Sequence, residues 1–149
     1  MPYDSKSIFP DFIVFPSAIS AIAIGLWSVQ AYKLGEARKD YKVKAPHVDG
    51  DPKFELIAHE YQNTSEALGA FIPATFMFSY YISPKYSAIL GGTWLFSKML
   101  SCCSFCTERE KETVYVRAFH ICLTHLSFFG LLAGSAIGIG SSLHNRYKL

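Results

Sequence analysis

The amino-acid sequence predicts an all-α integral membrane protein, a bundle of four transmembrane helices with up-down topology. Two observations predict this class. First, 50% of the 149 residues are hydrophobic and only 17% are charged, whereas soluble domains carry about 25% charged residues. Second, the apolar residues gather in four runs, each close to the ~20 residues that a helix needs to cross a bilayer. We therefore expect one membrane domain over 1–149, with helices over about 9–34, 54–82, 86–106 and 114–142.

The segments between the runs also favour four crossings. Ser83, Pro84 and Lys85 form a minimal turn, so the second and third helices are expected to make a tight hairpin. Residues 35–53 form the single long loop, and residues 107–113 are short and wholly polar. Nine basic residues fall in or beside these two loops, and four fall on the opposite side. By the positive-inside rule, the two loops face the cytosol or the mitochondrial matrix.

Composition disfavours several other classes. The net charge of +2 is too small to indicate a nucleic-acid partner, and no zinc-finger or helix-turn-helix pattern is present. Three cysteines, Cys102, Cys103 and Cys106, fall within a stretch of five residues inside an apolar run, and this spacing is not that of a disulfide framework. We interpret them as small apolar residues or as acylation sites. His120 and His125 are five residues apart, on different helical faces, so no metal site is expected.

A row of polar side chains interrupts the second run. Its members lie three or four residues apart and share one helical face; they are Glu55, His59, Gln62, Asn63 and Glu66. Ionisable groups at membrane depth are costly, so they must face protein or water. The row indicates either a functional site or a hydrogen-bond network that only holds the bundle together. The small residues of the fourth run equally leave open packing within one chain or an interface between chains.

Two motifs, separated by the long loop, resemble a known family. The residues concerned are 37–43 with Pro46 in the first motif, and Phe54, Glu55, 62–66 and Phe71 in the second. Both are similar to segments of the MAPEG family, the membrane-associated proteins of eicosanoid and glutathione metabolism. The nearest branch is that of the type-three microsomal glutathione transferases. Trp94 and Lys98 also stand where this family has a tryptophan and a basic residue on its third helix.

The resemblance implies a homotrimer of four-helix bundles, with glutathione bound between neighbouring subunits near the cytosolic side. It implies thiol activation by Arg38 and Lys39, if the chain is active. The glutathione-binding positions, if retained, are Arg38, His59, Asn63, Glu66 and Lys98. Basic groups at such positions hold the carboxylates of the peptide and favour the thiolate, which is the nucleophile.

The match is incomplete around the peptide. His59 replaces the arginine expected four residues before Asn63, and a neutral imidazole cannot replace a guanidinium fork. The other departures from the family pattern are Tyr61, Ala67, Gly69, Ser101 and Phe105. Each lost charge-assisted hydrogen bond costs ~1.5–3 kcal/mol, whereas millimolar binding amounts to only ~4 kcal/mol. These departures predict a degraded glutathione site.

We therefore expect a non-catalytic accessory or structural subunit of a larger membrane complex, such as a mitochondrial respiratory complex. Its partners would be membrane lipids and other membrane subunits, and its location the mitochondrial inner membrane. One alternative is an active microsomal glutathione transferase or peroxidase in the endoplasmic reticulum membrane, which acts as a homotrimer on lipophilic substrates. A further alternative is a non-enzymatic binder of lipids or eicosanoids.

Overall fold

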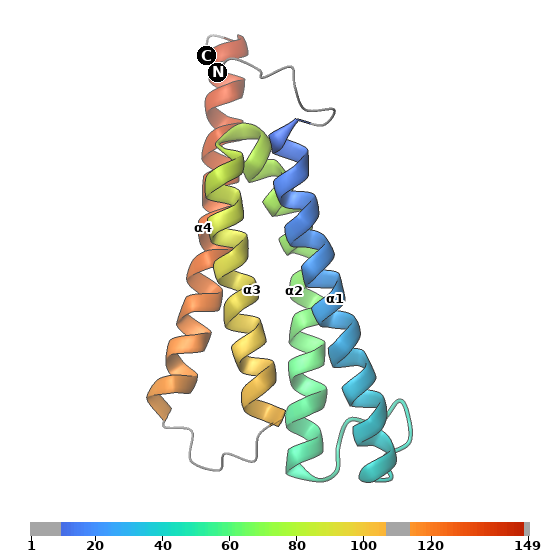
Figure 1. Ribbon diagram of the computed structural model, residues 1–149. Helices are drawn as coiled ribbons and strands as arrows, with labels where there is room; N and C mark the ends of the chain where they lie inside the picture. Colours follow the sequence, from blue (N-terminus) through green and yellow to red (C-terminus); the bar gives the residue numbers. More distant parts are fainter. Residues whose placement is uncertain (1–9, 107–113, 148–149) are drawn as a thin grey trace.

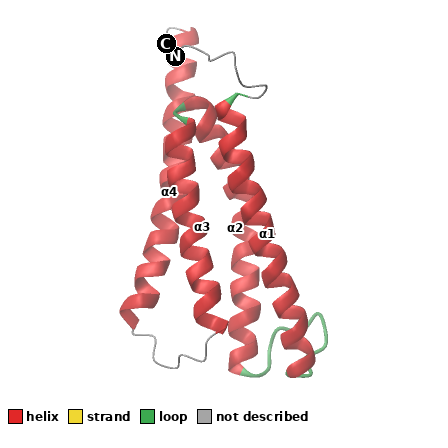
Figure 2. Cartoon of the chain, viewed as in Figure 1, coloured by secondary structure: helices red, strands yellow, loops and turns green. Residues whose placement is uncertain are grey.

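The structure, a computed structural model, describes residues 10–106 and 114–147, and every regular element in these ranges is a helix (Figures 1 and 2). The helices are α1 (Asp11–Asp40), α2 (Pro52–Tyr81), α3 (Pro84–Cys106) and α4 (Val114–Tyr147). They lie side by side and alternate in direction (Figure 1). The predicted all-α, up-down bundle of four helices is therefore confirmed.

Local chemistry determines where α2 and α3 begin. Asp51 caps α2, because its carboxylate accepts a hydrogen bond from the backbone N–H of Lys53 (2.8 Å). This bond satisfies one of the donors that the first helical turn leaves without a partner. Pro52 and Pro84 are the first residues of their helices, where a missing N–H costs nothing. Both helices thus begin two residues before the expected positions 54 and 86.

α1 is longer than the sequence predicted. The loop expected over 35–53 begins only after Asp40. The reason is tertiary packing: Ala37 is buried in a small cluster with Phe54 and Ala58 of α2. This contact stabilises two further helical turns whose composition is too polar to predict a membrane helix.

The carboxyl-terminal end of α1 is stabilised by hydrogen bonds, and that of α4 by a favourable charge. Lys42 has a left-handed backbone (φ 55°), and the N–H of Val43 donates to the carbonyl of Arg38 (3.1 Å). This is the Schellman arrangement that closes many helices. α4 likewise runs past its expected end at residue 142 to Tyr147, and its last turn carries Arg146. A cation there is favourable, because the carboxyl end of a helix is partly negative.

The core of the bundle combines aromatic and small side chains. Trp94 of α3 is 1% exposed and stacks on Phe71 of α2, with ring centroids 4.0 Å apart. The same cluster contains Ala23, Ala74, Phe78, Leu95 and Leu131. The two alanines allow close approach of the helix backbones, which dispersion contacts then hold together in lipid.

Buried hydroxyls add specific links between the helices. Ser79 of α2 donates to the carbonyl of Phe12 on α1 (2.9 Å). Ser87 of α3 donates to the carbonyl of Thr75 on α2 (2.8 Å). Interhelical hydrogen bonds of this kind contribute about 0.6–2 kcal/mol in membranes. They fix the rotation of each helix more sharply than apolar contacts do.

Much of the outer surface along the helices is apolar, as expected of a bundle whose solvent is lipid. Large apolar side chains are exposed along the helices; examples are Ile22, Ile24 and Val29 of α1 and Leu126, Phe129 and Ile137 of α4. Among the described residues, α1 and the Phe119–Tyr147 part of α4 are long and apolar enough to cross a membrane by composition alone. α2 and α3, which were also predicted to cross the membrane, do not meet that criterion in the described residues. For α2 this accords with its polar first half.

The close approach of α4 to α2 requires a glycine at position 134. A methyl group added there would overlap the ring of Phe78. We therefore expect Gly134→Ala to lower the free energy of unfolding by about 1–3 kcal/mol, the usual cost of overpacking. Denaturant unfolding of the purified protein in detergent measures this loss.

Gly140→Ala is the matched control on the same helix. Among the described residues, no group outside the adjoining backbone of α4 and its two chain neighbours lies within 4 Å of the position that its methyl group would occupy. Because alanine is the better helix former, this variant should be neutral or more stable by up to about 1 kcal/mol. Equal destabilisation of both variants would contradict the steric explanation.

Candidate functional site

The polar row of α2 lies along an outer face of the single chain. His59, Gln62, Asn63 and Glu66 are all exposed, and Gln62 donates to Glu66 one turn later (3.0 Å). Glu55, at the start of the row, is half-buried and accepts a bond from a backbone N–H of the preceding loop (3.0 Å). Lipid cannot satisfy such groups, so the row requires protein or water against it.

The two residues predicted to activate a thiol lie at the end of α1. The Arg38 guanidinium donates to the carbonyl of His47 in the following loop (2.7 Å). Its central carbon lies 5.5 Å from the centre of the Phe54 ring, within the range of a cation–π contact. Arg38 therefore holds the α1–α2 loop against α2. Lys39, beside it, is exposed.

A cavity of about 340 Å³ lies between α2, α3 and α4, and we call it the α4 cavity. Two predicted ligand-binding residues, Asn63 and Lys98, line it, whereas Arg38, His59 and Glu66 lie outside its lining. Its other polar residues are Glu60, Ser101, His120, Thr124 and His125. Its apolar residues are Ala67, Trp94, Ile121, Phe128 and Phe129. The α4 cavity therefore offers a polar side and an aromatic side to one ligand.

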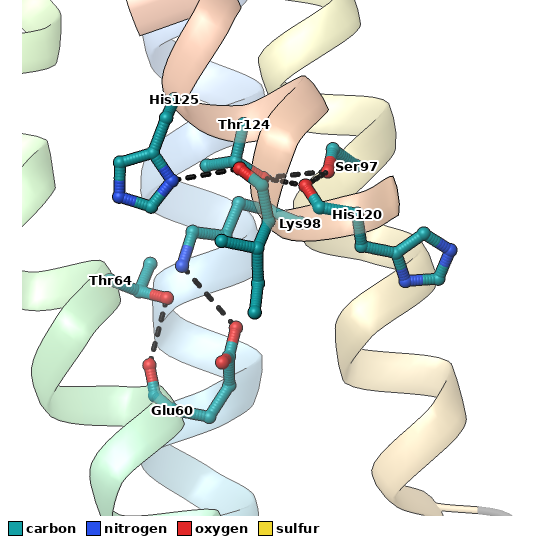
Figure 3. A network of polar contacts seen from close by, with 8 residues as sticks. Glu60, Thr64, Ser97, Lys98, His120, Thr124 and His125 are labelled. Carbon is teal, nitrogen blue, oxygen red and sulfur yellow. Dashed lines mark hydrogen bonds and ion pairs between the residues drawn. The ribbon is translucent and has the colours of Figure 1, made fainter. Parts of the chain in front are cut away.

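An ion pair joins α2 to α3 at the α4 cavity (Figure 3). Lys98 Nζ lies 3.4 Å from Glu60 Oε1, and the two side chains are only 10% and 14% exposed. This separation exceeds the roughly 2.7–2.9 Å of a tight charge-assisted hydrogen bond. The ammonium has three N–H donors, so Lys98 can pair with Glu60 and also bind an anionic group inside the cavity.

Two hydroxyls hold α3 against α4 beside this ion pair (Figure 3). The hydroxyls of Ser97 and Thr124 are 2.6 Å apart. Each lies 2.9 Å from the carbonyl oxygen of His120. Ser97 directly precedes Lys98 in the chain, so this network also fixes the height of the lysine relative to α4.

The ring of His125 is oriented by its own helix. Its Nδ1 lies 2.8 Å from the carbonyl oxygen of Ile121. A carbonyl only accepts hydrogen bonds, so the neutral ring carries its proton on Nδ1 and leaves Nε2 as an acceptor. Figure 3 shows this ring on the side of α4 where the Lys98 ammonium lies. Nε2 is therefore the ring nitrogen that can accept a proton.

Glu60 and His125 were not predicted as site residues. Glu60 precedes Asn63 by three residues and Ala67 by seven, which is the spacing of one helical face. The sequence therefore already indicates that Glu60 shares a face of α2 with Asn63. The rings of His120 and His125 point in opposite directions, as expected (Figure 3). Both residues still line the α4 cavity, because it covers a wide arc of α4.

Together, the fold and the site define a class: a four-helix membrane bundle with an amphipathic cavity and a polar row on its second helix. Residues 16–137 match the MAPEG family. The chain therefore belongs to the MAPEG family, as its motifs indicated, and it is an integral membrane protein.

Relatives of the chain extend over nearly its full length. A protein of Dictyostelium discoideum named probable microsomal glutathione S-transferase is 78% identical over 149 residues, which cover the whole of both chains. An uncharacterized protein of Synechocystis is 32% identical over 127 residues, 85% of this chain and 89% of that protein. Microsomal glutathione S-transferase 2 of Homo sapiens is 28% identical over 131 residues, 88% of this chain and 86% of that protein. The chain is thus related to microsomal glutathione S-transferases.

Proposed function

We propose that the chain is a membrane glutathione transferase, which joins the thiol of glutathione to lipophilic electrophiles. One observation carries the proposal: the α4 cavity combines a cation, an amide and an oriented imidazole with an aromatic wall. The polar groups suit a charged peptide thiol, and the wall of Trp94, Phe128 and Phe129 suits an apolar second substrate. The names of two relatives accord with this activity.

Each polar group of the α4 cavity has a distinct role in the proposed reaction. The Lys98 ammonium pairs with anionic groups of glutathione and favours its thiolate, and the Asn63 amide hydrogen-bonds the peptide. Nε2 of His125 accepts the thiol proton. The thiolate then attacks the electrophilic carbon, a sulfur–carbon bond forms, and the leaving group departs with its electron pair. The aromatic wall holds the electrophile close to the sulfur.

The polar row of α2 extends the proposal to an assembly. His59, Gln62 and Glu66 continue from Asn63 along an exposed face, and lipid is a poor neighbour for them. We propose that a second copy of the chain covers this row in a homotrimer, so that glutathione lies between subunits. The endoplasmic reticulum membrane is the location that accords with the relatives named microsomal.

The accessory subunit expected from the sequence remains the second candidate. It is favoured by the contacts of the two cations: Arg38 is engaged by the carbonyl of His47 and the ring of Phe54, and Lys98 is paired with Glu60. In both cases, the carboxylates of glutathione would have to compete with groups of the chain itself for the cation.

A conjugation assay separates the two candidates. Full-length protein, purified in detergent, is mixed with glutathione and chlorodinitrobenzene, and product absorbance is followed. The proposed transferase should accelerate conjugation and saturate with millimolar glutathione. A chain that neither catalyses the reaction nor binds glutathione is no transferase. Stoichiometric copurification with a fixed set of other membrane proteins would then favour the accessory subunit.

His125→Gln tests the proposed base in the same assay. A positioned general base contributes a factor of about 100 to 10,000, so kcat/KM should fall by at least about 100-fold. His144→Gln is the matched control, because His144 lies exposed in the last turn of α4 and outside the α4 cavity. It should retain full activity. An unchanged rate for His125→Gln would remove this residue from the mechanism.

A further inference from the structure

A second cavity lies in the groove between α1, α2 and α3, and we call it the α1 cavity. Its volume is about 390 Å³. Gln30 and Lys33 of α1, Glu60 of α2 and Cys102 of α3 are among the residues that line it. Of the residues assigned to the proposed reaction, none lines this cavity. Glu60 lines both cavities, but the thiol of Cys102 lies in the lining of the α1 cavity alone.

The Cys102 thiol lies beside a cation. Lys33 Nζ donates to Cys102 Sγ at 3.7 Å. An adjacent ammonium stabilises the thiolate, which is the reactive form of cysteine, whereas a cysteine buried among apolar groups is inert. Cys102 is only 9% exposed, but it lines the α1 cavity and can be reached from there.

Gln30 is an independent sign that the α1 cavity takes a polar ligand. This side chain is 4% exposed, and neither its Oε1 nor its Nε2 has a hydrogen-bond partner among the described residues. A buried amide without partners is unfavourable and rare in folded proteins. Because Gln30 lines the cavity, a ligand that both donates and accepts hydrogen bonds can satisfy it.

The charges around the α1 cavity select the kind of ligand. Glu36, Asp40 and Glu60 line it together with Lys33. Glu60 is paired with Lys98, while Glu36 and Asp40 are exposed at the end of α1. A lining with this excess of carboxylates attracts amines and repels anions. The ligand should therefore carry an amine rather than a net negative charge.

We propose that Cys102 is a modification site that undergoes thiol–disulfide exchange with disulfides of small aminothiols in the α1 cavity. The Cys102 thiolate attacks one sulfur of the disulfide, the original S–S bond breaks, and a mixed disulfide forms on Cys102. The other aminothiol leaves as a thiolate and takes up a proton from water, which has received the proton of Cys102. Cys102 is oxidised and the small disulfide is reduced, so no further oxidant is required.

Cystamine, a disulfide with two amines, is the probe for this proposal. The full-length protein carries Cys103→Ser and Cys106→Ser, so that two of its four cysteines, Cys102 and Cys122, remain. Both are treated with cystamine in detergent at neutral pH, and their modification is followed by mass spectrometry. Cys102 should react about tenfold faster than Cys122, although Cys102 is buried and Cys122 is exposed. Equal or faster reaction of Cys122 overturns the proposal.

Variants of Lys33 test the activation of the thiol. Lys33→Met keeps most of the length of the side chain without its charge, and it should slow the modification of Cys102 about tenfold. Lys33→Arg keeps the charge and should retain most of the rate. Size-exclusion chromatography checks that each variant is folded. A wild-type rate for folded Lys33→Met overturns the role of the cation.

A series of probe charges tests the preference for amines. Cystamine should react faster than neutral hydroxyethyl disulfide, and the latter faster than anionic glutathione disulfide. Combined Glu36→Gln and Asp40→Asn should reduce these differences. Equal rates for all three probes with the unaltered residues would overturn the assignment to aminothiols. These rates are measured without a conjugation substrate, so they stand or fall independently of the transferase proposal.

Discussion

Replacing Lys98 by methionine is expected to cost about 3–5 kcal/mol of unfolding free energy and to abolish glutathione conjugation. The variant leaves the Glu60 carboxylate, whose side chain is only 14% exposed, without the ammonium that lies 3.4 Å away. Losing one partner of a buried pair is costly because the remaining charge is no longer compensated. Denaturant unfolding in detergent measures the stability, and the conjugation assay measures the activity.

A double variant separates the two effects of Lys98. Glu60→Gln combined with Lys98→Met removes both charges, and most of the lost stability should return because no buried charge is left unpaired. Conjugation should stay abolished, since the cation proposed to hold glutathione is still missing. Recovery of activity in the double variant would show that Lys98 only neutralises Glu60.

Trp94→Ala is expected to produce a loss of similar size, about 3–5 kcal/mol. Trp94 is 1% exposed and stacks on Phe71 at the centre of the core. Its removal leaves a cavity between α2 and α3 that neighbouring side chains fill only in part. It also removes part of the aromatic wall of the α4 cavity, so conjugation of bulky apolar electrophiles should weaken more than glutathione binding.

Phe96→Ala is the matched control for Trp94→Ala. Phe96 lies two residues later on α3 and is 59% exposed, so its ring meets lipid rather than the core. A surface change of this kind should alter the unfolding free energy by only about 0.5 kcal/mol. Losses of equal size in the two variants would argue that α3 is not oriented as described.

The number and type of the helices could be predicted from the sequence because both depend on local properties. The length of an apolar run decides whether a segment can span a bilayer, and all four predicted segments correspond to helices. The predicted ends were less accurate. α1 continues to Asp40 because Ala37 packs on Phe54, and this contact joins residues that are far apart in the chain.

The candidate site was predicted only in part. Asn63 and Lys98 were both predicted as ligand-binding residues, and they do line one cavity. Arg38 was predicted to act on glutathione, but its guanidinium is bonded to the carbonyl of His47. The acceptor is a backbone atom in a loop, and no pattern of side chains along the sequence indicates such a partner. Whether Arg38 also reaches glutathione remains a prediction that the conjugation assay can test through Arg38→Ala.

By itself, the sequence determined the all-α membrane class, the number of helices and the polar face of α2. These features follow from the length of each apolar run and from the helical period of about 3.6 residues, and both can be read from one segment without knowledge of its neighbours. Only the tertiary structure decided which polar groups meet: Lys98 with Glu60, and Lys33 with Cys102. These pairs depend on the rotation and height of one helix relative to another. Those are determined by core packing, such as that of Trp94 on Phe71, and not by spacing along one helix.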